Sequence, residues 1–110
     1  MVLFIPTQGD SEKAMVSEQL GRANYFYVYW TDEHKGKFYK NTFLNENHGA
    51  GVKTAEFILK NKTDVLITPR VGEKVYDLLA DTTVKCVKPN GKIVKEVIQD
   101  YLQGELEDLY

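Results

Sequence analysis

The chain has one cysteine in 110 residues, so it cannot form an internal disulfide. A lone thiolate also excludes the paired cysteines at C-x-x-C spacing that usually hold zinc or an iron-sulfur cluster within one chain. Any such site would need mixed or shared ligands. The scarcity of cysteine indicates a protein of a reducing compartment, folded by its hydrophobic core alone.

The sequence also has no excess of basic residues, with 14 Lys and Arg against 16 Asp and Glu and a formal net charge of -2. Nucleic acid is therefore not expected as a partner, because sequence-independent binding to phosphates requires a basic surface. No apolar run approaches the ~20 residues of a membrane span, and residues 1–10 have no basic segment. We expect a cytoplasmic protein without a membrane partner.

What the sequence does contain is an ordered series of strand-like and helix-like patterns. Runs of β-branched and aromatic residues predict strands, and apolar residues at 3.6-residue spacing predict helices. The strands are expected at 2–5, 25–30, 37–44, 64–68 and 84–87, and the helices from 51, near 75–79 and at 93–102. In the first of these helices, the residues expected to face the core are Val52, Ala55, Ile58 and Leu59.

This order predicts one domain over residues 1–110, since no repeat, low-complexity tract or flexible linker divides the chain. Strands joined through helices are usually parallel with right-handed crossovers, whereas a hairpin adds an antiparallel strand beside the first. We therefore expect an α/β fold of three layers, α/β/α, around a five-stranded mixed sheet. Its order would be 3-2-1-4-5, the ribonuclease H-like topology.

Enzymatic chemistry has no support in the sequence. A ribonuclease H-type nuclease needs several carboxylates around two metal ions, but the first strand has no acid, and Asp64 lies at the beginning of its strand. Ser17, His34, His48 and Cys86 are potential nucleophiles or bases, yet no strand-turn-helix elbow presents any of them. We predict that the protein is not an enzyme.

The most informative local feature is His48-Gly49-Ala50-Gly51, between the third strand and the first helix. The two glycines allow a tight turn and a close approach by a ligand, and the helix N-terminus favours an anion there. His48 could coordinate a metal or donate a hydrogen bond to that anion. Alternatively, the glycines only connect a strand to a helix, and His48 is solvated or caps the helix.

Two arginines are further candidates for contact with an anion. Arg22, next to Gly21, could hold a carboxylate or another anionic group, or it could pair with Glu18 across one turn. Arg70, close to Gly72, follows the fourth strand, where ligands bind in open α/β sheets. The alternative for Arg70 is a solvated loop charge.

Cys86 lies in the last expected strand, between Lys85 and Val87. A buried free cysteine behaves as a small hydrophobic residue. The two interpretations of Cys86 are therefore core packing and a metal ligand.

Several blocks of sequence, taken in order, resemble the dinitrogenase iron-molybdenum cofactor biosynthesis family, the nitrogenase accessory factor-like domains. The blocks are VLFIP, VSEQLGRANYF, NHGAG leading into AEFIL, DVLIT with the Gly that follows, and GKIVKEVIQDYLQGEL. The resemblance covers almost the whole chain. It implies a small domain that binds or carries an iron-sulfur or iron-molybdenum cluster, or its precursor, without catalysing a reaction.

The resemblance also implies a cluster donor or acceptor protein as the partner, with the chain itself a monomer or a weak homodimer. The candidate cluster-binding residues, combining the family matches with Arg70, are Gly21, Arg22, His48, Gly49, Ala50, Gly51, Arg70 and Gly72. Gln19 stands where the family commonly has a histidine. A second hypothesis therefore stays open, in which the protein is an adaptor or regulatory domain that has lost metal binding.

Overall fold

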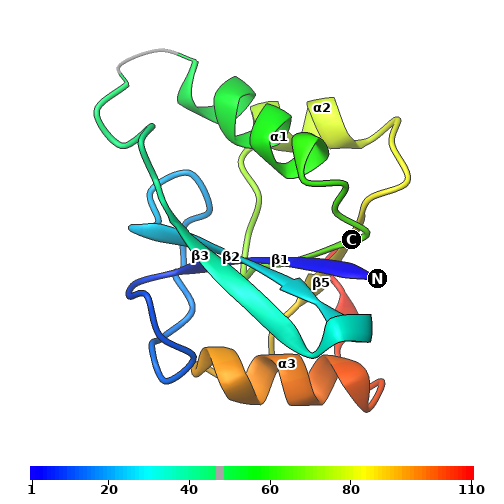
Figure 1. Ribbon diagram of the computed structural model, residues 1–110. Helices are drawn as coiled ribbons and strands as arrows, with labels where there is room; N and C mark the ends of the chain where they lie inside the picture. Colours follow the sequence, from blue (N-terminus) through cyan, green and yellow to red (C-terminus); the bar gives the residue numbers. More distant parts are fainter. Residues whose placement is uncertain (47–48) are drawn as a thin grey trace.

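Strand β1 (Val2–Thr7) lies at the centre of a six-stranded mixed sheet in a computed structural model that describes residues 1–46 and 49–110 (Figure 1). All its residues from Leu3 to Thr7 are buried, as the apolar run VLFIP predicts. The other strands are β2 (Tyr25–Trp30), β3 (Lys35–Lys40), β4 (Val65–Ile67), β5 (Lys85–Lys88) and β6 (Glu107–Asp108). The helices are α1 (Ala50–Lys60), α2 (Glu73–Leu79) and α3 (Val94–Leu102), with a short 3-10 helix at Thr31–Glu33.

The sheet order is β3-β2-β1-β4-β5-β6. Strand β1 pairs antiparallel with β2 and parallel with β4, and β4 pairs parallel with β5. The predicted order 3-2-1-4-5 is therefore confirmed, whereas the predicted number of five strands is wrong. The sixth strand, β6, runs antiparallel to β5. Its two acidic residues have low strand propensity, so no local pattern indicates it. The ribonuclease H-like label stays a prediction.

Helices cover both faces of the sheet, with α1 and α2 on one side and α3 on the other (Figure 1). Side chains alternate along β1 between the two layers, because successive residues of a strand point to opposite faces. Phe4 packs in the layer under α1 and α2, while Leu3 and Ile5 pack in the layer over α3. The mixed α/β fold of three layers is thus confirmed.

The buried face of α1 differs from the predicted one. Ala55 and Ile58 are buried as expected, but Val52 is 36% exposed and Leu59 is 41% exposed. Thr54 takes the remaining core position, because its hydroxyl donates to the carbonyl of Ala50 at 2.8 Å and so needs no water. Apolar spacing alone could not have selected a threonine for the core.

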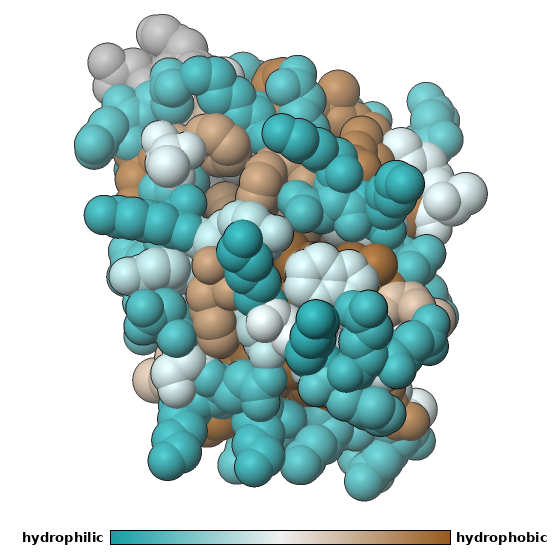
Figure 2. All heavy atoms as spheres, viewed as in Figure 1, coloured by the Kyte–Doolittle hydropathy of each residue, from teal (hydrophilic) through white to brown (hydrophobic). Residues whose placement is uncertain are grey.

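The outer edge of β3 carries Lys35, Lys37 and Lys40, all exposed. Lysines on an edge strand oppose pairing with another sheet, because they would have to leave water. In the view of Figure 2, hydrophilic side chains cover most of this side of the molecule, and apolar surface shows between them.

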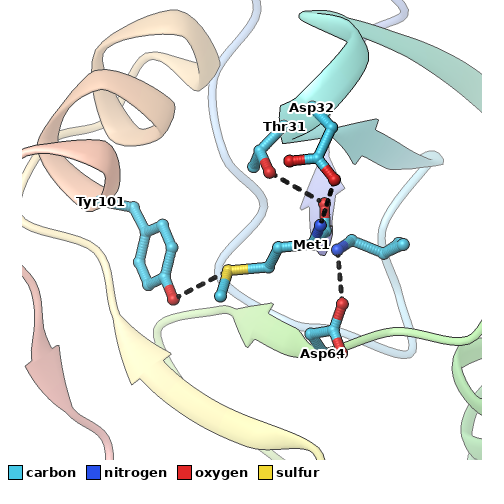
Figure 3. Close-up of polar contacts among 6 residues, drawn as sticks. Met1, Thr31, Asp32, Asp64 and Tyr101 are labelled. Carbon is cyan, nitrogen blue, oxygen red and sulfur yellow. Dashed lines mark hydrogen bonds and ion pairs between the residues drawn. The ribbon is translucent and has the colours of Figure 1, made fainter.

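The amino end of β1 is held by polar contacts from three other segments (Figure 3). The backbone N–H of Val2 donates to Asp64 Oδ2 at 2.7 Å, and Thr31 Oγ1 donates to the Met1 carbonyl at 3.2 Å. The Tyr101 hydroxyl lies 3.3 Å from the Met1 sulfur. The Asp64 carboxylate therefore contacts the backbone at the amino end of the sheet, opposite the end at which ligands bind.

The long connection between β1 and β2 crosses the carboxyl end of the sheet. It is held to the core by three buried hydrophobic residues, Val16, Leu20 and Ala23. The N–H of Ser17 also donates to the Pro6 carbonyl at 2.8 Å, which ties the connection to β1. Within the described residues, no helix is long and apolar enough to cross a membrane.

Candidate functional site

Two adjoining pockets share Gly21 and Arg22 as wall residues. The first has a volume of about 230 Å³ and lies between the β1–β2 connection and the start of α1. The second has a volume of about 250 Å³ and lies between the same connection and the segment that joins β4 to α2. We call the two together the double pocket. It brings together every predicted cluster-binding residue that the structure describes.

The first pocket includes the start of α1. Gly49, Ala50 and Gly51 line it, and Lys74 of α2 lines its other side. The N-cap residue Gly49 has no side chain with which to cap the helix, and the first turn has no acidic residue. The first backbone N–H groups of a helix have no partner within the helix and carry a partial positive charge. This wall is therefore suited to an anion. His48 lies outside the described residues, and its role stays a prediction.

The second pocket is formed at the carboxyl end of β4. Gln19, Leu20, Arg70 and Gly72 line it beside the two shared residues. The buried hydroxyl of Thr68 donates to the Arg70 carbonyl at 3.1 Å and so fixes the backbone there. The position of Arg70 outside this strand end agrees with the usual location of ligands in open α/β sheets.

The charges of the double pocket are mostly positive and exposed. Arg22, Arg70 and Lys74 all line it with solvent-exposed side chains. Glu46 also lines the first pocket, but its carboxylate accepts from Lys53 Nζ at 2.5 Å. Among the residues that the structure describes, no ion pair joins Arg22 to a carboxylate, so the alternative pairing with Glu18 is not seen. The guanidinium of Arg22 is available to a ligand.

The glycines of the double pocket differ in what a side chain would meet. Gly49 has φ +82°, which disfavours any side chain, whereas a Cβ on Gly51 would come into van der Waals contact with Lys74 Cβ at 3.4 Å. A Cβ on Gly21 or Gly72 would meet nothing within 4 Å. The folded chain would accept a methyl group at these two positions, where it would narrow the double pocket.

Asn41 is a positioning residue that the sequence analysis did not identify. Its buried side-chain amide donates to the carbonyls of Ala23 at 2.8 Å and Gly21 at 3.2 Å, and its oxygen accepts from the N–H of Phe43 at 2.8 Å. These bonds tie together two segments that line the first pocket, at Gly21 and at Phe43. An asparagine directly after a strand was the only signal, and it is typical of many turns.

Cys86 lies in a separate pocket of about 200 Å³, beside Tyr76 and Tyr110. Burial raises the pKa of its thiol, so the thiolate that would bind a metal is disfavoured. Its side chain packs against the layer of core under α1 and α2, in agreement with the core-packing interpretation. In the described residues, no three His, Cys, Asp or Glu side chains come together as a metal site.

These observations define a class: an α/β protein with a cationic, open pocket at the carboxyl end of its sheet. The chain belongs to the dinitrogenase iron-molybdenum cofactor family, whose sequence model matches residues 1–104. The family resemblance of the sequence blocks is therefore confirmed. A comparison with curated proteins finds no match.

Solved structures of similar proteins agree with the fold over nearly the full chain. A Thermotoga protein described as a NifB candidate has 30% identity, covers 98% of this chain and 92% of its own, and superposes with a TM-score of 0.85. The apo form of the orange protein of Desulfovibrio gigas has 25% identity, covers 97% of this chain and 91% of its own, and superposes with a TM-score of 0.88. A third structure, of a Methanocaldococcus jannaschii protein described as a dinitrogenase candidate, has 20% identity. It covers 99% of this chain and 94% of its own with a TM-score of 0.75, and it supports the fold alone.

Proposed function

We propose that this chain is a non-enzymatic binding or carrier domain for an anionic cluster of the iron-sulfur or iron-molybdenum type, or for its precursor. The observation that carries the proposal is the double pocket. It places Arg22 and Lys74 beside the start of α1 and Arg70 in the adjoining pocket, at the usual ligand edge of the sheet. Family membership supports a role in cofactor biosynthesis.

The donors of the double pocket fit a cluster held as a whole anion. Guanidinium and backbone N–H groups donate hydrogen bonds to sulfide or oxide atoms but do not ligate iron. Cys86, the only thiol of the chain, lies in the other pocket. We therefore assign the main binding energy to charge and hydrogen bonds, with His48 as the proposed metal ligand next to Gly49.

The exposure of the cationic side chains supports transfer rather than permanent storage. Arg22, Arg70 and Lys74 remain open to solvent, so a donor or acceptor protein can reach a bound cluster. A cluster without several covalent ligands to one chain also dissociates without breaking a ligand cage. The expected partners are a cluster donor and a cluster acceptor, with the chain acting as a monomer or a weak homodimer.

Anaerobic reconstitution tests this function. The purified chain would be incubated with iron, sulfide and molybdate, desalted, and analysed for bound metal, bound sulfide and visible absorption. We expect the wild type to retain cluster. We expect Arg22→Gln to bind at least roughly tenfold more weakly, the equivalent of one charge-assisted hydrogen bond of about 1.5 kcal/mol. Arg70→Gln should weaken binding less, because Arg70 lines only one of the two pockets.

Gly21→Ala separates binding from folding, because its methyl group would enter the double pocket and touch nothing in the folded chain. This variant should be at least as stable as the wild type and retain less cluster. Gly91→Ala is the matched control, since its Cβ would lie at an ordinary 3.6 Å from Glu96 Oε1 and Gly91 does not line the double pocket. Equal cluster content in the two glycine variants would contradict the assigned site.

His48→Ala tests the proposed ligand separately. If His48 ligates iron, the variant should change the visible spectrum of the reconstituted protein even where some cluster is retained. An unchanged spectrum would remove His48 from the site, whereas no cluster absorption in the wild type would overturn the proposed function as a whole.

A second candidate function is an adaptor or regulatory domain without metal binding. The observation that favours it is Gln19, which lines the second pocket where the family commonly has histidine. Glutamine is a poor ligand for iron. This alternative predicts no retained iron, sulfide or molybdenum. Gln19→His provides a direct comparison: cluster retention only in this variant would support the loss of metal binding in the natural sequence.

A further inference from the structure

The outer edge of β5 is covered by the chain's own residues 107–110. Strand β6 pairs with β5 so that Asp108 lies opposite Val87 and Glu107 opposite Lys88. The N–H of Leu109 then donates to the Cys86 carbonyl at 3.0 Å. This segment therefore extends the sheet by only a few backbone hydrogen bonds.

The charges of this segment complement those of the strand that it covers. Asp108 Oδ1 lies 3.3 Å from Lys85 Nζ, and Glu107 is the neighbour of Lys88. Beyond the acids, the ring of Tyr110 packs edge-on against Tyr76 with 4.6 Å between centroids. The edge of β5 thus recognises backbone, acidic side chains and one aromatic ring in a fixed order.

The aromatic ring borders a pocket that extends this recognition surface. Tyr76 and Tyr110 line it together with Leu79, Val84 and Cys86, and its volume is about 200 Å³. Its other walls come from α2 and from the segment that leads into β5. The double pocket has no lining residue in common with it.

Residues 107–110 are weakly attached, whereas the residues before them are anchored: Leu106 packs against the core layer over α3, and the Glu105 N–H donates to the Asp100 carbonyl at 2.9 Å. Both residues of β6 are exposed, the side chains of the Lys85–Asp108 pair are each 60% exposed, and Tyr110 is 64% exposed. Exposed ion pairs and exposed two-residue strands open at little cost in free energy. The match to the family also ends at residue 104, before this segment begins.

We propose that the edge of β5, with the pocket beside Cys86, is a docking site for an extended acidic segment of a partner protein, and that residues 107–110 occupy this site in the free chain. The partner segment would add a strand to β5, place its carboxylates at Lys85 and Lys88, and insert an aromatic or aliphatic side chain beside Tyr76. Binding requires displacement of the internal segment. The site is separate from the double pocket and does not depend on the proposed cluster binding.

The test uses a fluorescent peptide with the sequence of residues 104–110 and full-length protein. A variant designed to release the covering segment, called the released variant, combines two substitutions. Asp108→Lys replaces the ion pair with Lys85 by repulsion between two positive charges, and Leu109→Pro removes the N–H that donates to the Cys86 carbonyl. We expect the released variant to bind the peptide at least about tenfold more tightly than the wild type, because the wild-type internal segment competes at a high effective concentration. Fluorescence anisotropy measures both affinities.

The Cys86 thiol provides a second readout. Its reaction with a disulfide reagent should be faster in the released variant, and saturating peptide should slow it again, because the peptide covers the same pocket. Gln103→Lys is the control variant, since it adds a positive charge near the segment outside β6 and the Cys86 pocket. It should behave as the wild type in both assays.

Three results would overturn the proposal. The first is a released variant that is folded by circular dichroism but does not bind the peptide, and the second is equal peptide affinity in the released and wild-type proteins. The third is equal binding of a peptide with lysine in place of its three acids. If the released variant instead forms dimers through this edge, the occupant is a second copy of the chain and the proposed partner is wrong.

Discussion

A methyl group added at Gly36 would enter the ring of Tyr27. In the β2–β3 pair, Gly36 lies opposite Tyr29 while Tyr27 lies opposite Phe38, so the Tyr27 ring extends diagonally over the glycine. An ideal Cβ on Gly36 would lie 2.4 Å from Tyr27 Cζ. Carbon atoms that are not bonded do not approach so closely, so Gly36→Ala must move the ring or the strand.

The ring of Tyr27 has little freedom to move. It is 2% exposed, stacks on Phe38 with 4.0 Å between centroids, and donates a hydrogen bond to the carboxylate of Glu12. Overpacking of this kind costs about 1–3 kcal/mol. The alanine also lowers the entropy of the unfolded chain, which returns about 0.4–1 kcal/mol. The expected net destabilisation is therefore about 1–2 kcal/mol.

Urea denaturation followed by circular dichroism measures this loss of unfolding free energy. In thermal denaturation, the melting temperature should fall by roughly 4–8 °C for each kcal/mol of lost stability. In a Tyr27→Ala background, Gly36→Ala should cost little more, because the ring that it meets is gone. An unchanged stability of Gly36→Ala, or the same cost in both backgrounds, would refute the reasoning. Gly21→Ala is the reference, since its Cβ would meet nothing within 4 Å.

Three further outcomes follow from buried groups. Asn41→Ala should lower the unfolding free energy by about 2–3 kcal/mol, because the backbone groups of Gly21, Ala23 and Phe43 lose their hydrogen-bond partner. The same loss should weaken cluster retention; denaturation measures the first effect and reconstitution the second. Burial and then the Glu12 carboxylate raise the pKa of Tyr27 above the ordinary 10.0. The folded protein therefore keeps a proton that the unfolded chain loses, so this contribution to stability is complete below pH 10 and declines above it. Tyr27→Phe should therefore make the unfolding free energy depend less on pH in the alkaline range, as measured by denaturation curves at several pH values. Cys86→Ser should leave retained iron and sulfide unchanged, because the thiol lies outside the double pocket, and loss of cluster in this variant would contradict the assignment.

Much of the candidate site was predictable because its chemistry is local. A helix start beside glycines favours an anion, so residues 49–51 could be named as candidates without a structure. Arg70 could be identified for a similar reason, since it follows an apolar strand. Asn41 and Lys74 could not, because their roles depend on what the fold brings beside them. The proposed role of His48 is still to be tested.

The amino-acid sequence by itself determined the alternation of strands and helices and the order of the first five strands, because hydrophobic period and connection rules act over short distances. Only the tertiary structure decided that Arg22 lies between two pockets, and that Cys86 lies apart from both. It also decided that Glu107–Asp108 forms a sixth strand. Two acidic residues have no tendency to form a strand, and they do so here because β5 offers backbone partners and Lys85 offers a countercharge.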